Sequence, residues 1–255
     1  MIQFKNLTLA RGVRPLIVDA NLQVHAGWRV GLVGANGSGK SSLFALLRGE
    51  LHADLGDCEL PPAWRIASVA QETPALDTPA IDYVLDGDTE LREIERELAA
   101  AEAAHDGGDK LGELHGRLND IGGYGARARA ASLMAGLGFA PDEIERPVAE
   151  FSGGWRMRLN LAQALVSRCD LMLLDEPTNH LDLDAVVWLE KWLATFRGTL
   201  VVVSHDRDFL DGCVTHIAHI YCERLTFYTG NYSSFETQRA AQLAVQQAMY
   251  EKQQR

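Results

Sequence analysis

The residues whose types and spacing point most clearly to chemistry form a glycine-rich stretch over residues 34–41, GANGSGKS in one-letter code. An apolar run over 28–33 precedes it and a helical pattern follows, which is the setting of a phosphate-binding loop. Glycines there let successive backbone N–H groups turn toward a polyphosphate, and the helix adds the positive end of its dipole. We expect Lys40 to reach the β- and γ-phosphates and Ser41 to bind Mg²⁺. The predicted phosphate-binding residues are Gly34, Asn36, Gly37, Ser38, Gly39, Lys40, Ser41 and Ser42.

Two carboxylates that directly follow another apolar run would complete a triphosphate site. Residues 171–174 read as a buried strand, and Asp175 and Glu176 come next. Asp175 is placed to hold a hydrated Mg²⁺, and Glu176 to accept a proton from an attacking water. A second apolar run over 199–203 ends at Ser204-His205. The alternative, an acidic turn without chemistry, is disfavoured by the phosphate loop upstream.

The tripeptide Ser152-Gly153-Gly154 stands in front of an amphipathic helix. A serine N-cap and two residues without side chains would expose backbone amides, which predicts a second anion-binding helix end. Such a tripeptide is a weak signal alone. It gains meaning from its position just upstream of the strand that leads to Asp175.

Composition narrows the class of protein. The 255 residues are 47% hydrophobic, which supports a proper core, and 24 basic and 35 acidic residues give a formal charge of −11. That charge argues against this segment alone gripping a nucleic-acid backbone. The four cysteines are scattered without metal-ligand spacing, no apolar run approaches the roughly 18 residues of a membrane span, and the N-terminus lacks a signal peptide. A cytosolic protein is predicted.

The elements that must position these residues follow from periodicity. Residues 1–27 predict antiparallel strands, 58–62 a turn, and 65–70 a strand that delivers Gln71 to its end. Apolar strands alternate with helices toward the C-terminus, which indicates an α/β fold with a parallel sheet covered on both faces. Further helices are expected at about 40–48, 126–137 and 184–194, and a last pair of strands over 215–229.

Two segments have a purely helical period. Leu91, Ile94, Leu98 and Ala101 share one helix face, and the spacing returns after a glycine turn at 111–121, which predicts a helical hairpin. The hairpin either packs on its own domain or projects as an arm toward a partner. The chain from about 233 to 255 predicts one helix with no stop signal, which we interpret as the start of a linker in a longer protein.

The motifs 34–41, Gln71, Ser152-Gly153-Gly154, Asp175-Glu176, Asp182 and His205 together resemble the motif set of an ABC-type ATPase, in that family's order, over residues 1 to about 230. The stretches 175–182 and 204–210 resemble the ABC-F subfamily. The pattern over 151–158 and the short arm are similar to its YheS-like branch, N-terminal ABC domain. The resemblance implies a P-loop ATPase domain over 1–232, with a mostly parallel core sheet, an antiparallel β subdomain, and a helical subdomain with its hairpin arm inserted at about 77–168.

The resemblance also implies roles. Lys40 and the loop bind the phosphates of ATP, and Ser41, Gln71 and Asp175 contact Mg²⁺. Glu176 is the catalytic base, and His205 steadies the γ-phosphate. Ser152, Gly153 and Gly154 would clasp ATP held by a second ABC domain, and Asp182 belongs to the D-loop that addresses the opposite site. The second domain would lie in the same full-length chain or in a homodimer, and the isolated half would be a weak or inactive ATPase.

Three features depart from the family pattern. Arg11 stands near the place of the adenine-stacking aromatic, and either stacks its guanidinium on the base or leaves that contact missing. Trp155 replaces the glutamine common in the signature, and packs either at the domain interface or in the core. The acidic charge fits poorly with RNA contact by this half.

The leading interpretation is an ATPase module of a cytosolic ABC-F translation factor whose partners are the ribosome and tRNA, without a membrane. The alternative is the nucleotide-binding subunit of an ABC membrane transporter. Asn179-His180, where transporters more often have Ser-Ala, the arm and the long terminal helix disfavour it. A non-hydrolysing binding module is a third possibility, which Glu176 disfavours.

Overall fold

The computed structural model describes residues 1–70, 74–104 and 108–253. The chain divides into two compact units. Unit 1 comprises Met1–Ile66, Asp170–Asn179 and Glu190–Arg255, and unit 2 comprises Ala67–Cys169 and His180–Leu189. The α/β fold class predicted above is confirmed: a mostly parallel sheet, an antiparallel sheet and helices are all present.

A six-stranded sheet has the strand order β5-β6-β7-β3-β8-β9. The three pairings β6–β7, β7–β3 and β3–β8 are parallel, and β9 runs antiparallel to its neighbour β8. Because β6 and β7 are parallel and in register, Asp175 lies opposite Val203. The carboxyl ends of β3, β6 and β7 therefore share one edge, where polar residues of an open sheet can meet. The strands are β3 (Arg29–Gly34), β5 (Ile66–Ser68), β6 (Leu171–Asp175), β7 (Thr199–Val203), β8 (His216–Tyr221) and β9 (Arg224–Thr229).

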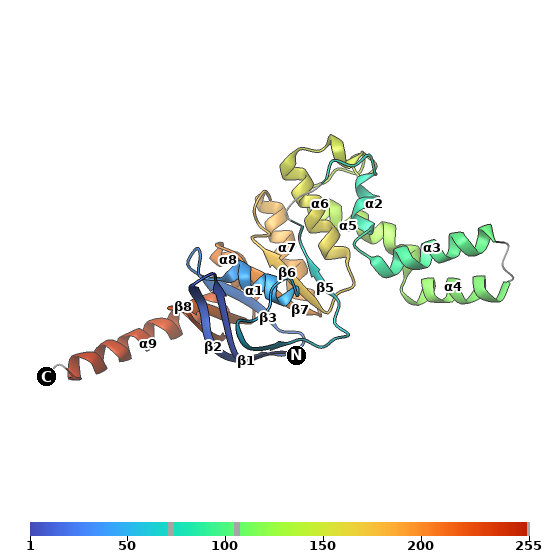
Figure 1. The fold of residues 1–255 in the computed structure, drawn as a ribbon. Helices are drawn as coiled ribbons and strands as arrows, with labels where there is room; N and C mark the ends of the chain where they lie inside the picture. The colour runs from blue at the N-terminus through green and yellow to red at the C-terminus, as the bar shows by residue number, and fades with distance from the viewer. Residues whose placement is uncertain (71–73, 105–107, 254–255) are drawn as a thin grey trace. The chain divides into compact units, whose positions relative to one another are not determined.

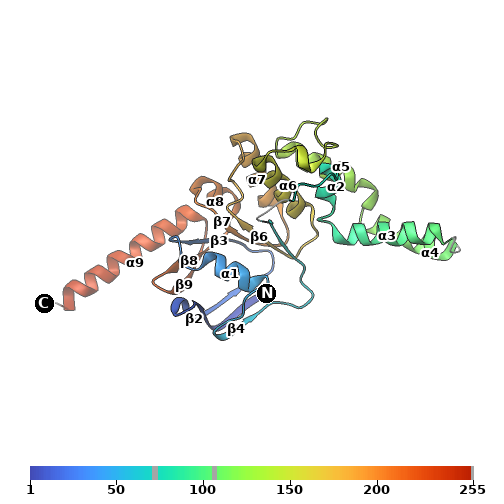
Figure 2. The ribbon, with the colours of Figure 1, turned by 45° about the horizontal axis from the view of Figure 1, so that its top comes forward.

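A three-stranded antiparallel sheet of order β2-β1-β4 also belongs to unit 1 (Figures 1 and 2). Its strands are β1 (Ile2–Arg11), β2 (Arg14–Val24) and β4 (Leu55–Glu59). The turn predicted at 58–62 is wrong in its first two residues, because Cys58 pairs with Phe4 and Glu59 with Gln3. β4 is almost entirely exposed, so no apolar alternation marks it, and pairing with β1 creates it.

The helices of unit 1 lie beside these sheets. α1 (Lys40–Leu47) buries Leu43 and Phe44 in the core between the two sheets. α8 (Arg207–Cys213) follows β7, and α9 (Tyr232–Gln253) follows β9. The first turns of α9 are fixed through the buried Phe235, and its remaining turns extend away from the sheets (Figures 1 and 2).

Unit 2 is helical. Its helices are α2 (Ala80–Leu85), α3 (Thr89–Ala103), α4 (Gly108–Asp120), α5 (Ala126–Gly136), α6 (Gly153–Val166) and the first turns of α7 (Leu183–Thr195), with 3₁₀ turns at Gly123–Gly125 and Val148–Glu150. The predicted hairpin is present as α3 and α4, which extend side by side from the other helices of the unit (Figure 1). Leu91, Ile94, Leu98 and Ala101 are buried as their spacing predicts.

A buried ion pair fixes the base of this hairpin. Asp88 caps the N-terminus of α3 by accepting from the Leu91 amide at 3.2 Å, and it is only 2% exposed. Nε of Arg168, just beyond α6, donates to the Asp88 carboxylate at 2.9 Å, and the same guanidinium donates to the Ile121 carbonyl after α4. Both helices of the hairpin are thereby tied to the end of α6. Among the described residues, no helix has the length and apolarity of a membrane span.

Candidate functional site

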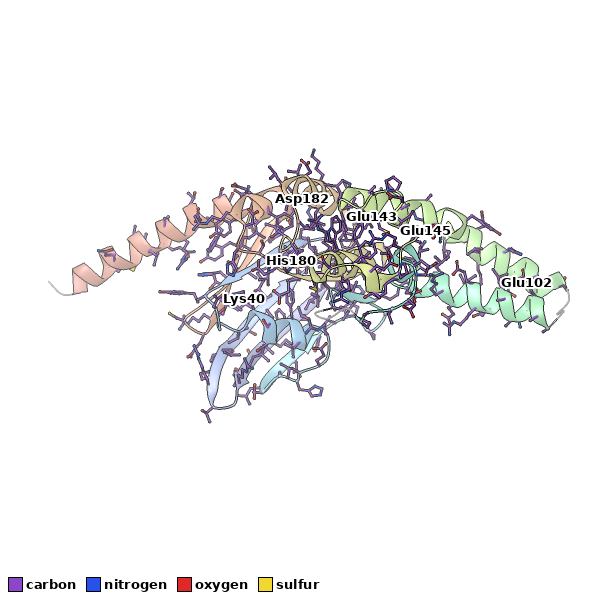
Figure 3. The ribbon with its side chains drawn as sticks, turned by 90° about the horizontal axis from the view of Figure 1, so that it is seen from above. Lys40, Glu102, Glu143, Glu145, His180 and Asp182 are labelled. Carbon is purple, nitrogen blue, oxygen red and sulfur yellow. The ribbon has the colours of Figure 1, made fainter. Side chains whose placement is uncertain are left out.

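The glycine-rich loop connects β3 directly to α1, as predicted. Gly37 and Gly39 have φ angles of 74° and 110°, in the region that favours glycine, and Gly39 is the N-cap of α1. The ammonium of Lys40 (Figure 3), the first residue of α1, donates to the carbonyls of Gly34 at 2.7 Å and Ala35 at 3.1 Å. The loop thus wraps around the ammonium of its own lysine, and the first backbone N–H groups of α1 have no partner within the helix.

Gly34 is required by close packing beneath the loop. A Cβ at this position would lie 2.6 Å from Oγ of Ser38 and 2.9 Å from the backbone oxygen of Ile220. Oγ of Ser38 is buried and has no hydrogen-bond partner among the described residues. A buried hydroxyl without a partner is costly, and an anion in the loop would give it one.

Glu176 and His205 face each other at the ends of the adjacent strands β6 and β7. The Glu176 carboxylate accepts from the His205 backbone amide at 3.2 Å, and its other oxygen lies 3.4 Å from the His205 ring nitrogen Nε2 without a hydrogen bond. Glu176 has a φ of 48°, and its own amide donates to Val203 at 2.9 Å. Non-glycine residues with positive φ are uncommon and cluster at functional sites. The backbone holds this carboxylate in a fixed position beside His205.

A cavity of about 360 Å³ collects these residues. Its lining includes Arg11, Asn36, Gly37, Gly39, Lys40, Ser41, Ser42, Asp175, Glu176 and His205, all of them predicted from the sequence. Leu16 of β2 and Val203 also line it, and sequence reasoning missed both, because an apolar strand residue carries no sign of a site. Gly34 and Ser38 lie in the loop but do not line the cavity. Gln71 falls outside the described residues.

The cavity offers suitable groups for a hydrated magnesium ion. Asp175 is exposed at the end of β6, and Ser41 lies in the first turn of α1. Among the described residues, no three His, Cys, Asp or Glu side chains form a group that could hold a metal. One carboxylate and one hydroxyl fit Mg²⁺, which takes its remaining ligands from water and substrate phosphates.

The predicted second anion-binding helix end lies in unit 2. Ser152 is the N-cap of α6, as predicted, and its side chain makes no capping hydrogen bond. Ser152 and Gly153 are exposed, and a Cβ on Gly153 would meet nothing within 4 Å. A Cβ on Gly154 would lie 3.8 Å from Nδ1 of His180. The first amides of α6 are therefore accessible and unobstructed by their own cap.

Arg158, one turn further along α6, gathers three segments of unit 2. Its guanidinium donates to the carbonyl of His180 at 2.8 Å, to the carbonyl of Leu137 at 3.0 Å and to the carboxylate of Asp182 at 3.0 Å. His180 and Asp182 are marked in Figure 3. Asp182 also caps α7 by accepting from the Ala185 amide at 3.0 Å. The Ala185 amide and then Arg158 lower the pKa of Asp182, which keeps it ionised.

Trp155 packs inside unit 2. Its ring meets Phe139 edge-on at 4.9 Å between centroids, and the Arg158 guanidinium lies 4.4 Å above it. This half-buried tryptophan therefore supports the arginine. The sequence left open whether Trp155 packs at the domain interface or in the core. In the structure it packs against residues of its own unit.

Two further positions were not predicted. Arg158 is one. Asn160 is the other: it is buried, donates to the Ala70 carbonyl at 2.9 Å and accepts from the Tyr83 hydroxyl at 2.7 Å. Ala70 immediately precedes Gln71. The sequence did contain a signal for Asn160, because it is a polar residue on the apolar face of α6. A buried amide is normally hydrogen-bonded, so such a position predicts specific partners.

The chain is similar in sequence to known ATP-binding proteins. Residues 17–179 match a family model described as "ABC transporter", and residues 218–255 match a second model with the same description. The chain is 57% identical over all its length to the "Probable ATP-binding protein YheS" of Escherichia coli K12 and 55% identical to that of Haemophilus influenzae, covering 40% of each relative. It is 41% identical over 99% of its length to mouse "ATP-binding cassette sub-family F member 3", covering 36% of that protein.

Solved structures agree on the fold. A structure titled "Structure of ATP binding subunit of ABC transporter" has a TM-score of 0.65 and 16% identity, with 90% of both chains covered. At that identity the likeness concerns the fold alone. The chain spans about two fifths of the length of the curated relatives it matches.

Proposed function

Because the chain belongs to the ABC-type ATPase family, in its ABC-F subfamily, we propose that its cavity binds ATP with Mg²⁺ and that it hydrolyses ATP together with a second ABC domain. The observation that carries this proposal is the meeting of Lys40, Glu176 and His205 around one cavity at the carboxyl edge of the parallel sheet. Anion-binding amides, a cation and a fixed carboxylate are the parts that phosphoryl transfer to water requires.

Each residue has a task in the proposed reaction. The loop amides and Lys40 hold the phosphates, and Ser38 donates from beneath the loop. Asp175 and Ser41 would hold Mg²⁺, which neutralises charge on the phosphates when bound. Glu176 accepts the proton of the attacking water, while His205 donates to the terminal phosphate. Arg11 lines the cavity at the β1–β2 turn, where it would stack on the adenine.

The proposed site needs a second wall. The accessible end of α6, with Ser152 and Gly153, belongs to unit 2 and is proposed to clasp the ATP of a second ABC domain. Asp182 would address that same opposite site. That the curated relatives are more than twice as long supports a second domain within one protein.

We extend the proposal to the role of the whole protein: a cytosolic, ribosome-associated translation factor in which ATP binding closes two domains and hydrolysis releases them. The support is the ABC-F membership and the helical hairpin of α3 and α4, which extends from unit 2 (Figure 2). In this proposal α9 is the start of the linker that connects the two ABC domains.

Two measurements test the proposal. The first is ATP turnover of this chain alone and of the protein that carries both ABC domains. We expect the chain alone to bind ATP but to turn it over at least about a hundredfold more slowly. Equal rates without dimerisation would contradict the composite site.

The second measurement is co-sedimentation of the whole protein with ribosomes, with and without ATP, in the Glu176→Gln variant. An absence of ATP-dependent association would rule out the translation-factor role and leave the ATPase assignment standing.

A further inference from the structure

A second cavity, of about 350 Å³, lies beside the first in unit 1. Lys40 and His205 line both cavities, so the two meet at these side chains. The ends of β3 and β8 and the beginnings of α8 and α9 form its walls. The side chains that matter here are Arg207, His219, Tyr221, Tyr232, Phe235 and Arg239. None of these six takes part in the proposed hydrolysis.

Two guanidinium groups border the cavity, each above a tyrosine ring. Arg207 lies 5.5 Å from the centroid of Tyr232, and Arg239 lies 5.0 Å from that of Tyr221. Arg207 is ion-paired with Glu236 at 2.9 Å, whereas no carboxylate of the described residues forms an ion pair with Arg239. Arg239 therefore places on the α9 wall a positive charge that has no ion-pair partner among the described residues.

His219 is a buried polar residue that lines this cavity, as is Ser204. Only 7% of it is exposed, and its ring stacks on Tyr221 at 5.7 Å and meets Phe235 at 5.1 Å between centroids. Neither ring nitrogen has a hydrogen-bond partner among the described residues. Burial, and secondly the charge of Arg239, lowers the pKa of His219 to about 4, so the ring is neutral at pH 7 with one donor and one acceptor. The ring lines the cavity, where a ligand can reach it.

We propose that this cavity binds a small aromatic phosphate, an anion that carries a flat ring. The planar fork of an arginine matches the geometry of a phosphate, which assigns the anionic group to Arg239 and the neighbouring Arg207. Tyr221, which is 55% exposed, and the half-buried Tyr232 offer aromatic surface for the ring beside the two guanidinium groups. His219 supplies the hydrogen bond that it does not make within the chain. The volume stands near the lower end of ligand pockets, roughly 300–1,000 Å³, which limits the ligand to about the size of a nucleoside monophosphate.

The shared lysine gives this site a regulatory consequence, which rests on the proposed ATP-binding function. A phosphate in the cavity that Lys40 and His205 also line repels the phosphates of ATP in the adjacent cavity. The aromatic phosphate therefore lowers the affinity for ATP several-fold. By linkage, ATP lowers the affinity for the aromatic phosphate by the same factor.

Calorimetric titration of the whole protein tests the site, with phenyl phosphate as the probe and inorganic phosphate as the ringless comparison. We expect phenyl phosphate to bind at least about tenfold more tightly than inorganic phosphate. Arg239→Gln should weaken phenyl phosphate binding at least about tenfold, the usual worth of a charge-assisted hydrogen bond. Arg239→Lys keeps the charge but loses the planar guanidinium. Its affinity for phenyl phosphate should lie between those of the wild type and of Arg239→Gln. ATP affinity measured without phenyl phosphate should stay unchanged in both variants.

Arg224→Gln is the matched control, because Arg224 is exposed at the start of β9 and does not line the cavity. It should bind phenyl phosphate like the wild type. The proposal is overturned if phenyl phosphate does not bind, if inorganic phosphate binds equally well, or if Arg239→Gln has no effect in a protein with an unchanged unfolding temperature. Binding of phenyl phosphate without any effect on ATP affinity would overturn the coupling alone. Failure of ATP to bind, with phenyl phosphate binding intact, would instead refute the proposed function.

Discussion

Arg158 and Asp182 form an ion pair of 3.0 Å in which the arginine side chain is 11% exposed and the carboxylate is 57% exposed. The arginine belongs to α6, whose first turn carries Ser152 and Gly153, and the carboxylate caps α7. One buried cation thus joins two segments that are both proposed to act on the ATP of a second domain. Arg158 touches no proposed substrate, so its proposed role is to position the residues that do.

The first prediction concerns this pair. Arg158→Gln removes the charge and weakens the bonds to the carbonyls of Leu137 and His180. Because these contacts lie in unit 2, ATP binding in the cavity of unit 1 should be unchanged. Turnover by the two-domain protein should fall about ten- to a hundredfold, the signature of a lost transition-state interaction. Steady-state kinetics together with ATP titration measure the two effects separately.

A double-mutant cycle with Asp182→Asn, which keeps the cap acceptor but removes the charge, sharpens this test. Residues in direct contact should show a coupling free energy of about 0.5–3 kcal/mol in turnover. Arg146→Gln is the control, because Arg146 is 42% exposed, forms its ion pairs among the described residues with Glu143 and Glu150, and lies over the Phe151 ring without contacting Asp182. Strictly additive effects of the Arg158 and Asp182 substitutions would contradict a joint role.

The second prediction concerns Glu176. Glu176→Gln keeps the size and the acceptor for the His205 amide but can no longer accept a proton. Turnover should fall by a factor of roughly 10² to 10⁴, the usual contribution of a general base, while ATP affinity is retained. Glu59→Gln, which loses only an exposed ion pair with Lys5, should behave like the wild type. Unchanged turnover in Glu176→Gln would assign the base to another group.

The third prediction concerns base recognition by Arg11. Arg11→Ala should weaken ATP binding about two- to thirtyfold, the range of a cation–π contact of roughly 0.5–2 kcal/mol, and Arg11→Tyr should restore it. Arg14 is the matched control, since it pairs with Arg11 across the β1–β2 turn but does not line the cavity. Titrations with fluorescent ATP measure the effect. Equal losses in Arg11→Ala and Arg14→Ala would indicate a general charge effect without stacking.

The fourth prediction concerns pH and His219. Burial lowers its pKa in the folded protein from 6.5 to about 4, so between these values the unfolded chain binds a proton that the folded chain does not. The stabilisation is complete above about pH 6.5 and is lost as pH falls toward 4. Urea unfolding at pH 7 and pH 5 should show a loss that is smaller by about 1–3 kcal/mol in His219→Leu. The exposed His52→Leu should retain the wild-type difference, and an identical pH dependence in His219→Leu would refute the assignment.

The fifth prediction uses two helical glycines of unit 2. A Cβ on Gly136, in α5, would lie 2.0 Å from the Trp188 ring, whereas a Cβ on Gly116, inside α4, would meet nothing within 4 Å. Gly136→Ala should destabilise the protein by about 1–3 kcal/mol through overpacking, and Gly116→Ala should stabilise it by about 1 kcal/mol through helix propensity. Chemical denaturation of both variants provides the measurement. A stabilising Gly136→Ala would show that Trp188 moves freely.

Much of the cavity was predictable because its residues follow short, strongly patterned strands. Asp175 and His205 each come one or two residues after a buried apolar strand, and Lys40 follows a glycine loop, so parallel pairing alone brings them to one edge. The fold class and the ABC-F, YheS-like assignment are confirmed for the same reason: these motifs are local in sequence and carry their own spacing.

What escaped prediction depends on contacts between distant segments. β4 has an exposed pattern interrupted by Gly56, and it is a strand only because β1 offers it backbone partners. Arg158 reads as an ordinary helical arginine until α6 is placed beside the turn at Asp182. Tertiary pairing overrides local propensity in the first case and gives a charge its partners in the second.

Helix α6 connects the Ser152-Gly153 end of unit 2 to the root of the hairpin, so it should transmit a pulling force between them. Its first turn carries Ser152 and Gly153, and the residue just past its last turn, Arg168, grips the buried Asp88 and the Ile121 carbonyl at the root of the hairpin. A straight helix of 14 residues is about 21 Å long and nearly incompressible. Pulling on either α3 or α4 therefore strains the same short bundle of contacts. The Asp88–Arg168 pair therefore shares the load on the hairpin with the contacts of Arg92 to Asp82 and Asp86 and of Arg129 to the Gly122 carbonyl.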